Sequence, residues 1–586
     1  MSWLSLGRPQ ISFYRPDADS VALVIEGEKK TWPMRKDNQG NWTTRLHRPY
    51  RVLDGSAYHF DVRCNGNRYE IADPLAHRTE RRGKKLVSLF SNLSYTHIHA
   101  RFRAPPIEDI VIYETHLPAL TRHPSAKVRE ESHKGTYKGV CSPSVLGHLQ
   151  RMNVAVEFLP LHANDPALGQ DWGYFSTSFH AMRSDFAADR NQVNREVMAM
   201  VDTLHGRGIP VLLDVVFNHG GELWVKAWGK QIVYRKLDKG SFCEGSGCGP
   251  TIRTEHPHVR ETILNSLEDL VKKYRFDGFR FDLGALHDKR TMLEIDRRLP
   301  DHIYLIAEPW ALGGAKWGKD DMHGDLASTR WAIWNDDFRE PGKAFILGRG
   351  DHLNRDRLMR AIVGSNVKDG GWAVRPQQSI NYLSSHDGKT LADLLRGDKH
   401  RQFLGAILLL TSQGVPMLGE GTELMYSKKD HSNSYNRPDL NQIDWTNASK
   451  HRDLMEAVAR LITLRRQLPH FRYKHNLVVN DNKRDDWDID WIFPSGYPHH
   501  DNVNAIGYVL RPPPRKRSRK HGKQDCLVIL LNGSAKGADF HLPTGEWKVL
   551  VDGLAFEVNA FGLSGVPNAR RHYYTHPGSG VILAPA

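Results

Sequence analysis

The stretch Tyr274-Arg275-Phe276-Asp277-Gly278-Phe279-Arg280-Phe281-Asp282-Leu283 decides the fold. Its aromatic residues alternate with polar ones, which predicts a short strand with one buried face. We expect the strand to end at Asp282, because Gly284 follows closely. Arg280 lies two residues before Asp282 and therefore shares a face with it. A neighbouring guanidinium keeps such a carboxylate ionised and fixes its rotamer, as a nucleophile requires.

Outward from this stretch, apolar strand-like runs alternate with helical patterns. The expected strands are Ile110–Glu114, Val154–Leu161, Pro210–Phe217, Gly278–Asp282, Ile303–Ala307, Ser379–Leu383 and Val415–Leu418. The expected helices between them include Asn191–Gly206, Val259–Tyr274 and Leu391–Leu395. Repeated β–α alternation over residues 106–470 predicts a central (β/α)8 TIM barrel.

The segments before and after the barrel have sequence patterns typical of strands and turns. Residues 1–105 contain the expected strands Ser20–Ile25 and Ser56–Val62, with a turn at Asp37-Asn38-Gln39-Gly40. Residues 471–586 contain the expected strands Ala505–Leu510, Cys526–Leu531 and Trp547–Leu550. We therefore predict a multidomain chain with an N-terminal β-sandwich, a barrel and a C-terminal β-sandwich.

Composition limits the class of protein. Hydrophobic residues make up 40% and charged residues 25% of the 586, which is ordinary for a globular protein. No run approaches the ~20 apolar residues of a membrane span, so no membrane partner is expected. Met1–Asp19 lacks the basic start and apolar core of a signal peptide, which predicts a cytoplasmic protein.

A surplus of positive charge raises the question of an anionic partner. Lys and Arg number 81 against 67 Asp and Glu, for a net charge of +14. Much of this surplus lies in the basic run Arg515–Lys523. We favour a solvated loop over a nucleic-acid patch, because no aromatic residue is interleaved for base stacking.

The five cysteines indicate a reducing compartment. Their number is odd and they are scattered through the chain, at Cys64, Cys141, Cys243, Cys248 and Cys526. A disulfide in the loop between Cys243 and Cys248 stays open as an alternative. No second Cys or His pair at metal spacing lies nearby, which argues against zinc there.

Three further strand ends carry polar groups. They are Asp214-Val215-Val216-Phe217-Asn218-His219, Ala307-Glu308-Pro309-Trp310 and Ser384-Ser385-His386-Asp387. Strand ends of a barrel converge on one face, so we expect Asp282, Glu308 and Asp387 to meet in one cleft. Arg280, His219 and His386 are expected beside them. Such carboxylates suit glycoside cleavage, in which one attacks the anomeric carbon and another protonates the leaving oxygen. Trp310 could supply the apolar wall that an acid needs.

With Asp282, these four stretches resemble the four signature regions of glycoside hydrolase family 13, the α-amylase family. The resemblance implies that Asp282 is the nucleophile, Glu308 the acid/base and Asp387 the transition-state stabiliser. It implies substrate-binding or site-shaping roles for Arg280, His219, His386, Asp214 and Asn218.

Other stretches resemble the debranching branch of that family. Ile112-Tyr113-Glu114-Thr115-His116 resembles its first barrel strand, and Asp171-Trp172-Gly173-Tyr174 resembles its loop in which the tyrosine stacks on the sugar. Glu308–Gly314 and Trp334–Arg339 are similar to isoamylase, whereas Asn433-Ser434-Tyr435-Asn436 is similar to pullulanase. The front domain resembles a family-48 carbohydrate-binding module.

Departures from the family pattern concern the third strand and its loop. Phe217 stands where debranching relatives carry tyrosine, which removes one hydroxyl. The segment Gly220–His256 is short for the domain that typical α-amylases insert here, and it offers no carboxylate cluster for calcium. No metal or other cofactor is therefore expected. Tyr174 and Trp310 are expected to contact sugar, and Trp334 to pack in the core.

The favoured function is a retaining hydrolase of α-1,6 branch linkages, with a branched α-glucan as partner. An α-1,4-acting amylase or a glucanotransferase on the same scaffold is the alternative, since the catalytic residues are common to all three. A non-catalytic glucan-binding subunit is a remote alternative, because it would be expected to lose carboxylates that this chain retains. The further alternative, a nucleic-acid-binding protein, is supported only by the basic run Arg515–Lys523.

Overall fold

The computed structural model describes residues 9–164, 171–237, 240–313, 319–481, 487–494, 496, 502–512, 526–558, 567–569 and 571–586. The basic run Arg515–Lys523 lies outside these residues. The chain divides into two compact units. The first comprises Met1–Arg103, Val128–Pro143 and Phe158–Met322, and the second comprises Ala104–Lys127, Ser144–Glu157 and His323–Ala586.

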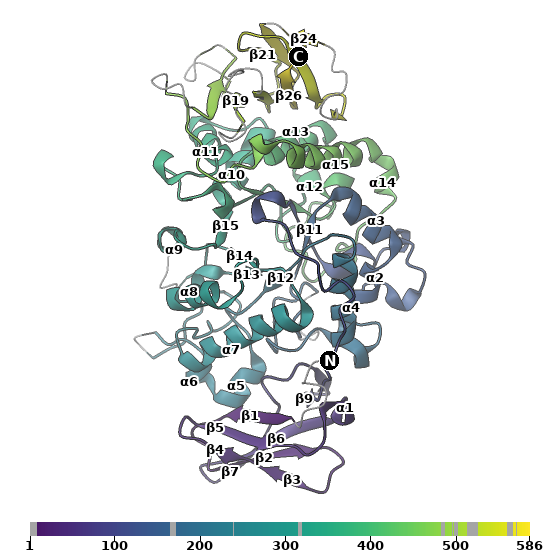
Figure 1. The fold of residues 1–586 in the computed structure, drawn as a ribbon, viewed down its shortest axis with the longest axis vertical. Helices are drawn as coiled ribbons and strands as arrows, with labels where there is room; N and C mark the ends of the chain where they lie inside the picture. Colours follow the sequence, from purple (N-terminus) through teal and green to yellow (C-terminus); the bar gives the residue numbers. More distant parts are fainter. Residues whose placement is uncertain are drawn as a thin grey trace. The chain divides into compact units, whose positions relative to one another are not determined.

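The first unit begins with two antiparallel sheets (purple in Figure 1). One holds β1 (Gln10–Tyr14), β5 (Asn41–Arg45) and β4 (Arg35–Lys36). The other runs β3 (Thr31–Pro33), β2 (Ser20–Ile25), β6 (Ala57–Cys64), β9 (Lys85–Leu89) and β8 (Thr79–Arg82), with β7 (Asn67–Ile71) beside β6. Alternate residues of β2, namely Val21, Leu23 and Ile25, are buried. The predicted N-terminal β-structure is confirmed.

Eight strands in chain order form a closed barrel. They are β10 (Ile112–Thr115), β11 (Ala155–Phe158), β12 (Val211–Val215), β13 (Gly278–Phe281), β14 (Tyr304–Ala307), β15 (Ala332–Asn335), β16 (Ser379–Tyr382) and β17 (Val415–Gly419). Every residue of these strands is buried, which explains why they read as apolar runs rather than as alternating ones. The predicted TIM barrel is confirmed.

Seven of the eight strands overlap the predicted runs, and β15 is the strand that prediction missed. Its four residues combine Ile333 and Trp334, which favour strands, with Ala332 and Asn335, which do not, so its composition carries only a weak strand signal. At the start of β13, a Cβ on Gly278 would lie 2.6 Å from Tyr304 Cβ. A glycine is therefore required for β13 and β14 to approach this closely.

Helices follow most of the barrel strands. Their bounds are α2 (Tyr137–Val140), α3 (Pro143–Met152), α4 (Val193–His205), α5 (Glu222–Trp228), α6 (Lys230–Val233), α7 (Pro257–Asp269), α8 (Lys289–Arg298), α9 (Lys319–Leu326), α10 (Asp336–Ile346), α11 (His352–Ile362), α12 (Leu391–Leu394), α13 (Lys399–Thr411), α14 (Asn447–Lys450) and α15 (Arg452–Gln467). The helix predicted at Val259–Tyr274 consists of α7 and a π-helical turn, Leu270–Tyr274. Arg275, with a left-handed φ of 65°, ends it.

The second unit ends in antiparallel β-structure. Its larger sheet runs β18 (Ile489–Ile492), β19 (Ala505–Leu510), β20 (Leu527–Asn532), β26 (Ser579–Pro585), β22 (Trp547–Asp552) and β23 (Glu557–Val558), and β24 (Pro567–Ala569) pairs with β22. A two-stranded sheet joins β21 (Ala538–His541) to β25 (His572–Thr575). Phe540 of the small sheet packs with Leu530 and Leu583 of the large one in a single buried cluster. The predicted C-terminal β-sandwich is confirmed, while its boundary at residue 470 stays a prediction.

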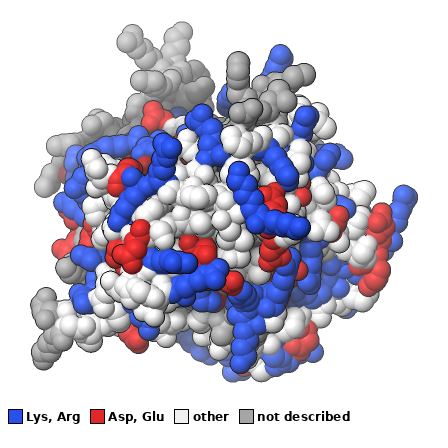
Figure 2. Space-filling view, turned by 90° about the horizontal axis from the view of Figure 1, so that it is seen from below, with Lys and Arg blue, Asp and Glu red and all other residues white. Residues whose placement is uncertain are grey.

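All five cysteines are free thiols, so the alternative of a Cys243–Cys248 disulfide is wrong. None of the helices in the described ranges is both long and apolar enough to cross a membrane. On the face that Figure 2 shows, Lys and Arg side chains are interleaved with Asp and Glu side chains. The positive surplus on that face is therefore interrupted by negative charge.

Candidate active site

Three neighbouring strands of the first unit bring together three of the predicted acidic residues, Asp214, Asp282 and Glu308. Asp214 of β12 lies opposite Arg280 of β13, and Phe281 of β13 lies opposite Ala307 of β14. Asp282 and Glu308 are therefore the first residues beyond two adjacent paired strands. Parallel pairing in register places both carboxylates at the same edge of the sheet.

The guanidinium of Arg280 lies between three carboxylates. Its Nη1 lies 2.8 Å from Asp214 Oδ2 and 3.1 Å from Asp282 Oδ1, and its Nη2 lies 3.1 Å from Glu308 Oε2. Arg280 and Asp214 are each only 1% exposed. Burial alone would lower the pKa of Arg280, but Asp214, Glu308, Tyr174 and Asp282 together raise it well above its usual value. The guanidinium is thus a permanent cation between its carboxylate partners.

Asn218 holds Asp282 from a second direction. Its Nδ2 donates to Asp282 Oδ2 at 2.7 Å and to the Asp282 backbone carbonyl at 2.8 Å. With Arg280 on Oδ1, both oxygens of Asp282 are directed by hydrogen bonds, which leaves the carboxylate one orientation. His219 makes a hydrogen bond with Asn218 Oδ1, and burial lowers the pKa of His219 although the Asp282 charge opposes this. His219 is therefore a neutral imidazole at neutral pH.

The residue after Asp282 connects the two carboxylates. Leu283 adopts the left-handed conformation, with φ 42° and ψ 52°, which is costly for a residue with a branched side chain. This conformation directs its backbone N–H to Glu308 Oε2 at 2.7 Å. Glu308, only 4% exposed, therefore receives hydrogen bonds from Arg280 and from the chain that follows Asp282.

Tyr174 joins this cluster from the predicted Trp-Gly-Tyr loop. Its hydroxyl donates to Asp214 Oδ2 at 2.6 Å. The loop depends on Gly173, which has a φ of 101° and on which a Cβ would lie 2.6 Å from the Pro160 carbonyl oxygen. Trp172 is 5% exposed, whereas the ring of Tyr174 is half-buried and remains accessible to a ligand.

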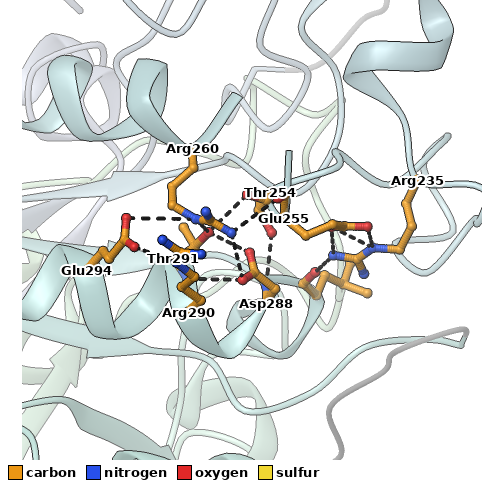
Figure 3. Close-up of polar contacts among 9 residues, drawn as sticks. Arg235, Thr254, Glu255, Arg260, Asp288, Arg290, Thr291 and Glu294 are labelled. Carbon is orange, nitrogen blue, oxygen red and sulfur yellow. Dashed lines mark hydrogen bonds and ion pairs between the residues drawn. The ribbon is translucent and has the colours of Figure 1, made fainter. Parts of the chain in front are cut away.

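A polar network supports the chain beyond Asp282 (Figure 3). Arg235 forms an ion pair with Glu255, with 3.0 Å between Nη2 and Oε2, and its Nη2 also donates to the Leu286 carbonyl at 2.9 Å. Arg260 donates to Thr291 Oγ1 at 2.9 Å and to Asp288 Oδ1 at 3.2 Å. Asp288 caps the N-terminus of α8. The short run from Asp282 to α8 is therefore fixed at its far end by ion pairs that do not contact the carboxylate cluster.

The second unit carries its own polar cluster, built around His386 and Asp387. Ser385 Oγ donates to Asp387 Oδ1 at 2.8 Å, and His386 Nδ1 lies 2.8 Å from Glu114 Oε1. Lys428 Nζ donates to the His386 carbonyl at 2.7 Å. Asp387 is half-buried, so its carboxylate retains access to a ligand.

Glu114, Lys428 and Glu420 of this cluster were not among the predicted site residues. Glu420 directly follows β17, and its Oε2 accepts from Thr115 Oγ1 and from the His116 backbone, both at 2.9 Å. Burial raises the pKa of Glu420 to about 7, because these hydrogen bonds and Lys428 only partly compensate for desolvation. The strand-end argument that identified Asp282 and Glu308 would have found Glu420 as well.

Each predicted site residue can now be placed within its own unit. In the first unit Asp282, Glu308, Arg280, Asp214, Asn218, His219 and Tyr174 form one connected cluster, and Trp310 is half-buried. His386 and Asp387 are joined to Glu114 and Lys428 in the second. Trp334 is 1% exposed and lies 4.7 Å from Tyr382, between ring centroids, in agreement with the predicted core packing.

Known proteins provide an independent comparison, although no model of a known protein family matches the chain. The glycogen debranching enzyme of Yersinia enterocolitica is 31% identical over 518 residues, which cover 76% of this chain and 74% of that enzyme. The pullulanase of Bacillus acidopullulyticus shares the fold, with a TM-score of 0.84, 23% identity, and coverage of 98% of this chain and 73% of that one. The pullulanase of Paenibacillus barengoltzii, solved with maltohexaose and α-cyclodextrin, has a TM-score of 0.82 and 26% identity over 98% of this chain and 94% of that one.

Glu420 generates a prediction about pH. Its pKa in the folded protein, about 7, exceeds the ordinary value of 4.5. Its neutral form therefore favours folding below pH 4.5, and this contribution is lost as the pH rises through about 7. Glu420→Gln keeps an uncharged acceptor at every pH. We expect the melting temperature of the variant to rise relative to wild type between pH 4.5 and 8, by the equivalent of about 3 kcal/mol.

The matched control is Glu131→Gln, whose carboxylate is 85% exposed, and its melting-temperature difference from wild type should not change with pH. If the melting-temperature difference between Glu420→Gln and wild type were also independent of pH across this range, Glu420 would be ionised throughout.

Proposed function

The chain belongs to the debranching branch of glycoside hydrolase family 13, and we propose that it is a retaining hydrolase of α-1,6 branch linkages in glycogen- or starch-type glucans. The observation that carries the proposal is the pair of carboxylates, Asp282 and Glu308, bound to opposite nitrogens of the buried Arg280. Two carboxyl groups that flank one bond are the chemical requirement for glycoside hydrolysis.

In the first step, Asp282 is the nucleophile. One of its oxygens bonds to the anomeric carbon while the glycosidic C–O bond breaks and Glu308 gives its proton to the departing oxygen. Arg280 and Asn218 bind the two oxygens of Asp282 and hold its carboxylate in one orientation for this attack. In the second step Glu308 takes a proton from water, whose oxygen then replaces Asp282 at the anomeric carbon and regenerates the carboxylate.

The remaining residues position the sugar. We assign Asp387 to the third carboxylate, which stabilises positive charge on the ring as the glycosidic bond breaks. Neutral His219 can exchange hydrogen bonds with sugar hydroxyls, and Tyr174 offers an aromatic ring to the apolar face of the sugar. We give His386 and Trp310 sugar-contact roles, and Asp214 and Asn218 the role of holding Tyr174, Arg280 and Asp282 in place.

The proposal also assigns the enzyme specificity for α-1,6 branch points. The segment between His219 and α7 holds only the short helices α5 and α6 and a few isolated bridges in its described part. This part contains no large inserted domain, which leaves room beside β12 for a forked substrate. The Yersinia relative is a glycogen debranching enzyme and the structural neighbours are pullulanases, and all of these names agree with α-1,6 specificity.

Location and domain roles complete the proposal. We place the enzyme in the cytoplasm, where five free thiols persist, three of them buried. We assign residues 1–105 to a carbohydrate-binding module of the family-48 type, 106–470 to catalysis and 471–586 to a supporting β-sandwich.

Replacing either carboxylate tests the catalytic assignment. Asp282→Asn removes the nucleophile and Glu308→Gln the proton donor, so each should lower kcat on amylopectin by about 10³-fold or more with the fold retained. The two variants should differ with α-maltosyl fluoride, because fluoride leaves without a proton. Glu308→Gln should therefore still show a burst of fluoride release, and Asp282→Asn should not.

Glu261→Gln on the surface of α7, whose side chain is 52% exposed, is the matched control and should retain full activity. Turnover of amylopectin by Glu308→Gln close to the wild-type rate would refute the acid/base assignment.

Linkage specificity is tested with three glucans side by side. Amylopectin should release linear malto-oligosaccharides with a rise in iodine colour, since long unbranched chains appear, and amylose should be cut slowly or not at all. Tyr174→Ala should weaken hydrolysis of every cleaved substrate, because stacking at the cleaved sugar does not depend on the linkage that follows.

Rapid loss of iodine colour with amylose, without a rise on amylopectin, would assign the chain to the α-1,4 amylase alternative. Pullulan, the third glucan, adds a linear substrate whose α-1,6 links carry no branch, and its hydrolysis would indicate a pullulanase rather than an isoamylase preference.

A further inference from the structure

A cluster of two histidines and a carboxylate lies away from the carboxylates around Arg280. His77 follows β7 in the N-terminal sheets, His180 lies in the loop after the Trp-Gly-Tyr segment, and Asp269 ends α7. One ligand atom from each side chain lies within 4.8 Å of the other two. Because the three residues are about 90 or more positions apart in sequence, no spacing motif could have revealed them.

His180 lacks the hydrogen-bond partner that a buried imidazole normally has. The residue is 7% exposed, and its Nε2 has no hydrogen-bond partner among the described residues. A neutral imidazole keeps a lone pair on one ring nitrogen, and this lone pair can bind a metal ion. A buried nitrogen without a partner is unfavourable, and either a metal ion or an ordered water molecule can satisfy it.

His77 and Asp269 complete the donor set. His77 Nε2 lies 2.7 Å from Asp269 Oδ2, and their side chains are 23% and 28% exposed, so solvent reaches the pair. The backbone carbonyl of His77 accepts a hydrogen bond from Asn194 Nδ2 of α4 at 3.1 Å. The segment that carries His77 is therefore held close to the other two ligands before any ion binds.

We propose that His77, His180 and Asp269 bind one divalent transition-metal ion of the zinc class, which fastens the N-terminal sheets to the barrel part of the first unit. Two imidazoles and one carboxylate suit zinc, whereas calcium and magnesium prefer oxygen ligands only. Ligand atoms on one tetrahedral zinc lie about 3.4 Å apart, so the His77–Asp269 pair, now 2.7 Å apart, has to open slightly, and the wider separations, at most 4.8 Å, have to close. His77, which is partly exposed, can make this movement. A water molecule fills the fourth position.

Lys273 competes with the metal ion for the carboxylate of Asp269. Its Nζ lies 2.7 Å from the same Asp269 Oδ2 that contacts His77. A metal ion must displace this ammonium group or share the carboxylate with it, and the two positive charges repel each other. Removal of the ammonium group should therefore strengthen metal binding, an outcome that loss of folding cannot imitate.

The test uses the full chain without an affinity tag, freed of metal by chelation and dialysis. Titration with Zn²⁺ should show one equivalent bound per chain and a raised melting temperature. Co²⁺ as a spectroscopic probe should give the visible absorption of a tetrahedral site. His77→Ala and Asp269→Asn should abolish this site, and Lys273→Ala should raise its affinity by about tenfold.

His59→Ala is the matched control. His59 lies in the same N-terminal sheets beside a carboxylate, with its Nε2 3.8 Å from Glu70 Oε1, and the described residues give it no third ligand. This variant should bind Zn²⁺ and Co²⁺ like wild type. Absence of a stoichiometric Zn²⁺ site, equal binding by His77→Ala, or no gain with Lys273→Ala would each overturn the proposal. Activity on glucans is a separate readout, so failure of this test would leave the hydrolase assignment untouched.

Discussion

The contact on which the active-site cluster depends is the buried ion pair network of Arg280. An almost fully buried cation touches the carboxyl groups of Asp214, Asp282 and Glu308. Buried charges are costly unless each remaining lone pair finds a donor. Asn218, Tyr174 and the Leu283 backbone N–H supply those donors. The cluster can therefore exist only where three strands and two loops deliver these groups to one point, which the closed parallel barrel achieves.

The same constraint explains local features that would otherwise be unfavourable. Leu283 has a left-handed backbone, and its N–H donates to Glu308. Gly173 has a positive φ beside the Pro160 carbonyl, in the loop whose Tyr174 hydroxyl donates to Asp214. The network of Arg235, Arg260 and Asp288 fixes the other end of the Asp282 segment. Strain at the carboxylates is thus balanced by ion pairs some residues away, as is common at functional sites.

Most of the barrel, and the meeting of Arg280, Asp282 and Glu308 in one candidate site, could be predicted from the sequence, because apolar strands that end in a charged residue leave a local signal. Arg280 and Asp282 share a strand face by alternation alone. The missed β15 mixes two strand-forming residues with Ala332 and Asn335, which weakens its signal. Glu114 and Lys428 are recognised only once their strand and loop are placed, whereas the strand-end argument applied to β17 would have found Glu420. His77, His180 and Asp269 lie beyond sequence reasoning for a different reason: three distant segments meet only in the folded unit.

The anomeric configuration of the first product tests the central claim most directly. If Asp282 attacks the anomeric carbon and Glu308 protonates the departing oxygen, two displacements occur and the α configuration is retained. Proton NMR recorded within the first minutes of hydrolysis, before the sugar mutarotates, should show the α anomer of the released reducing end. Initial appearance of the β anomer would mean that water attacks the anomeric carbon directly, and it would contradict the assignment of Asp282 as the nucleophile.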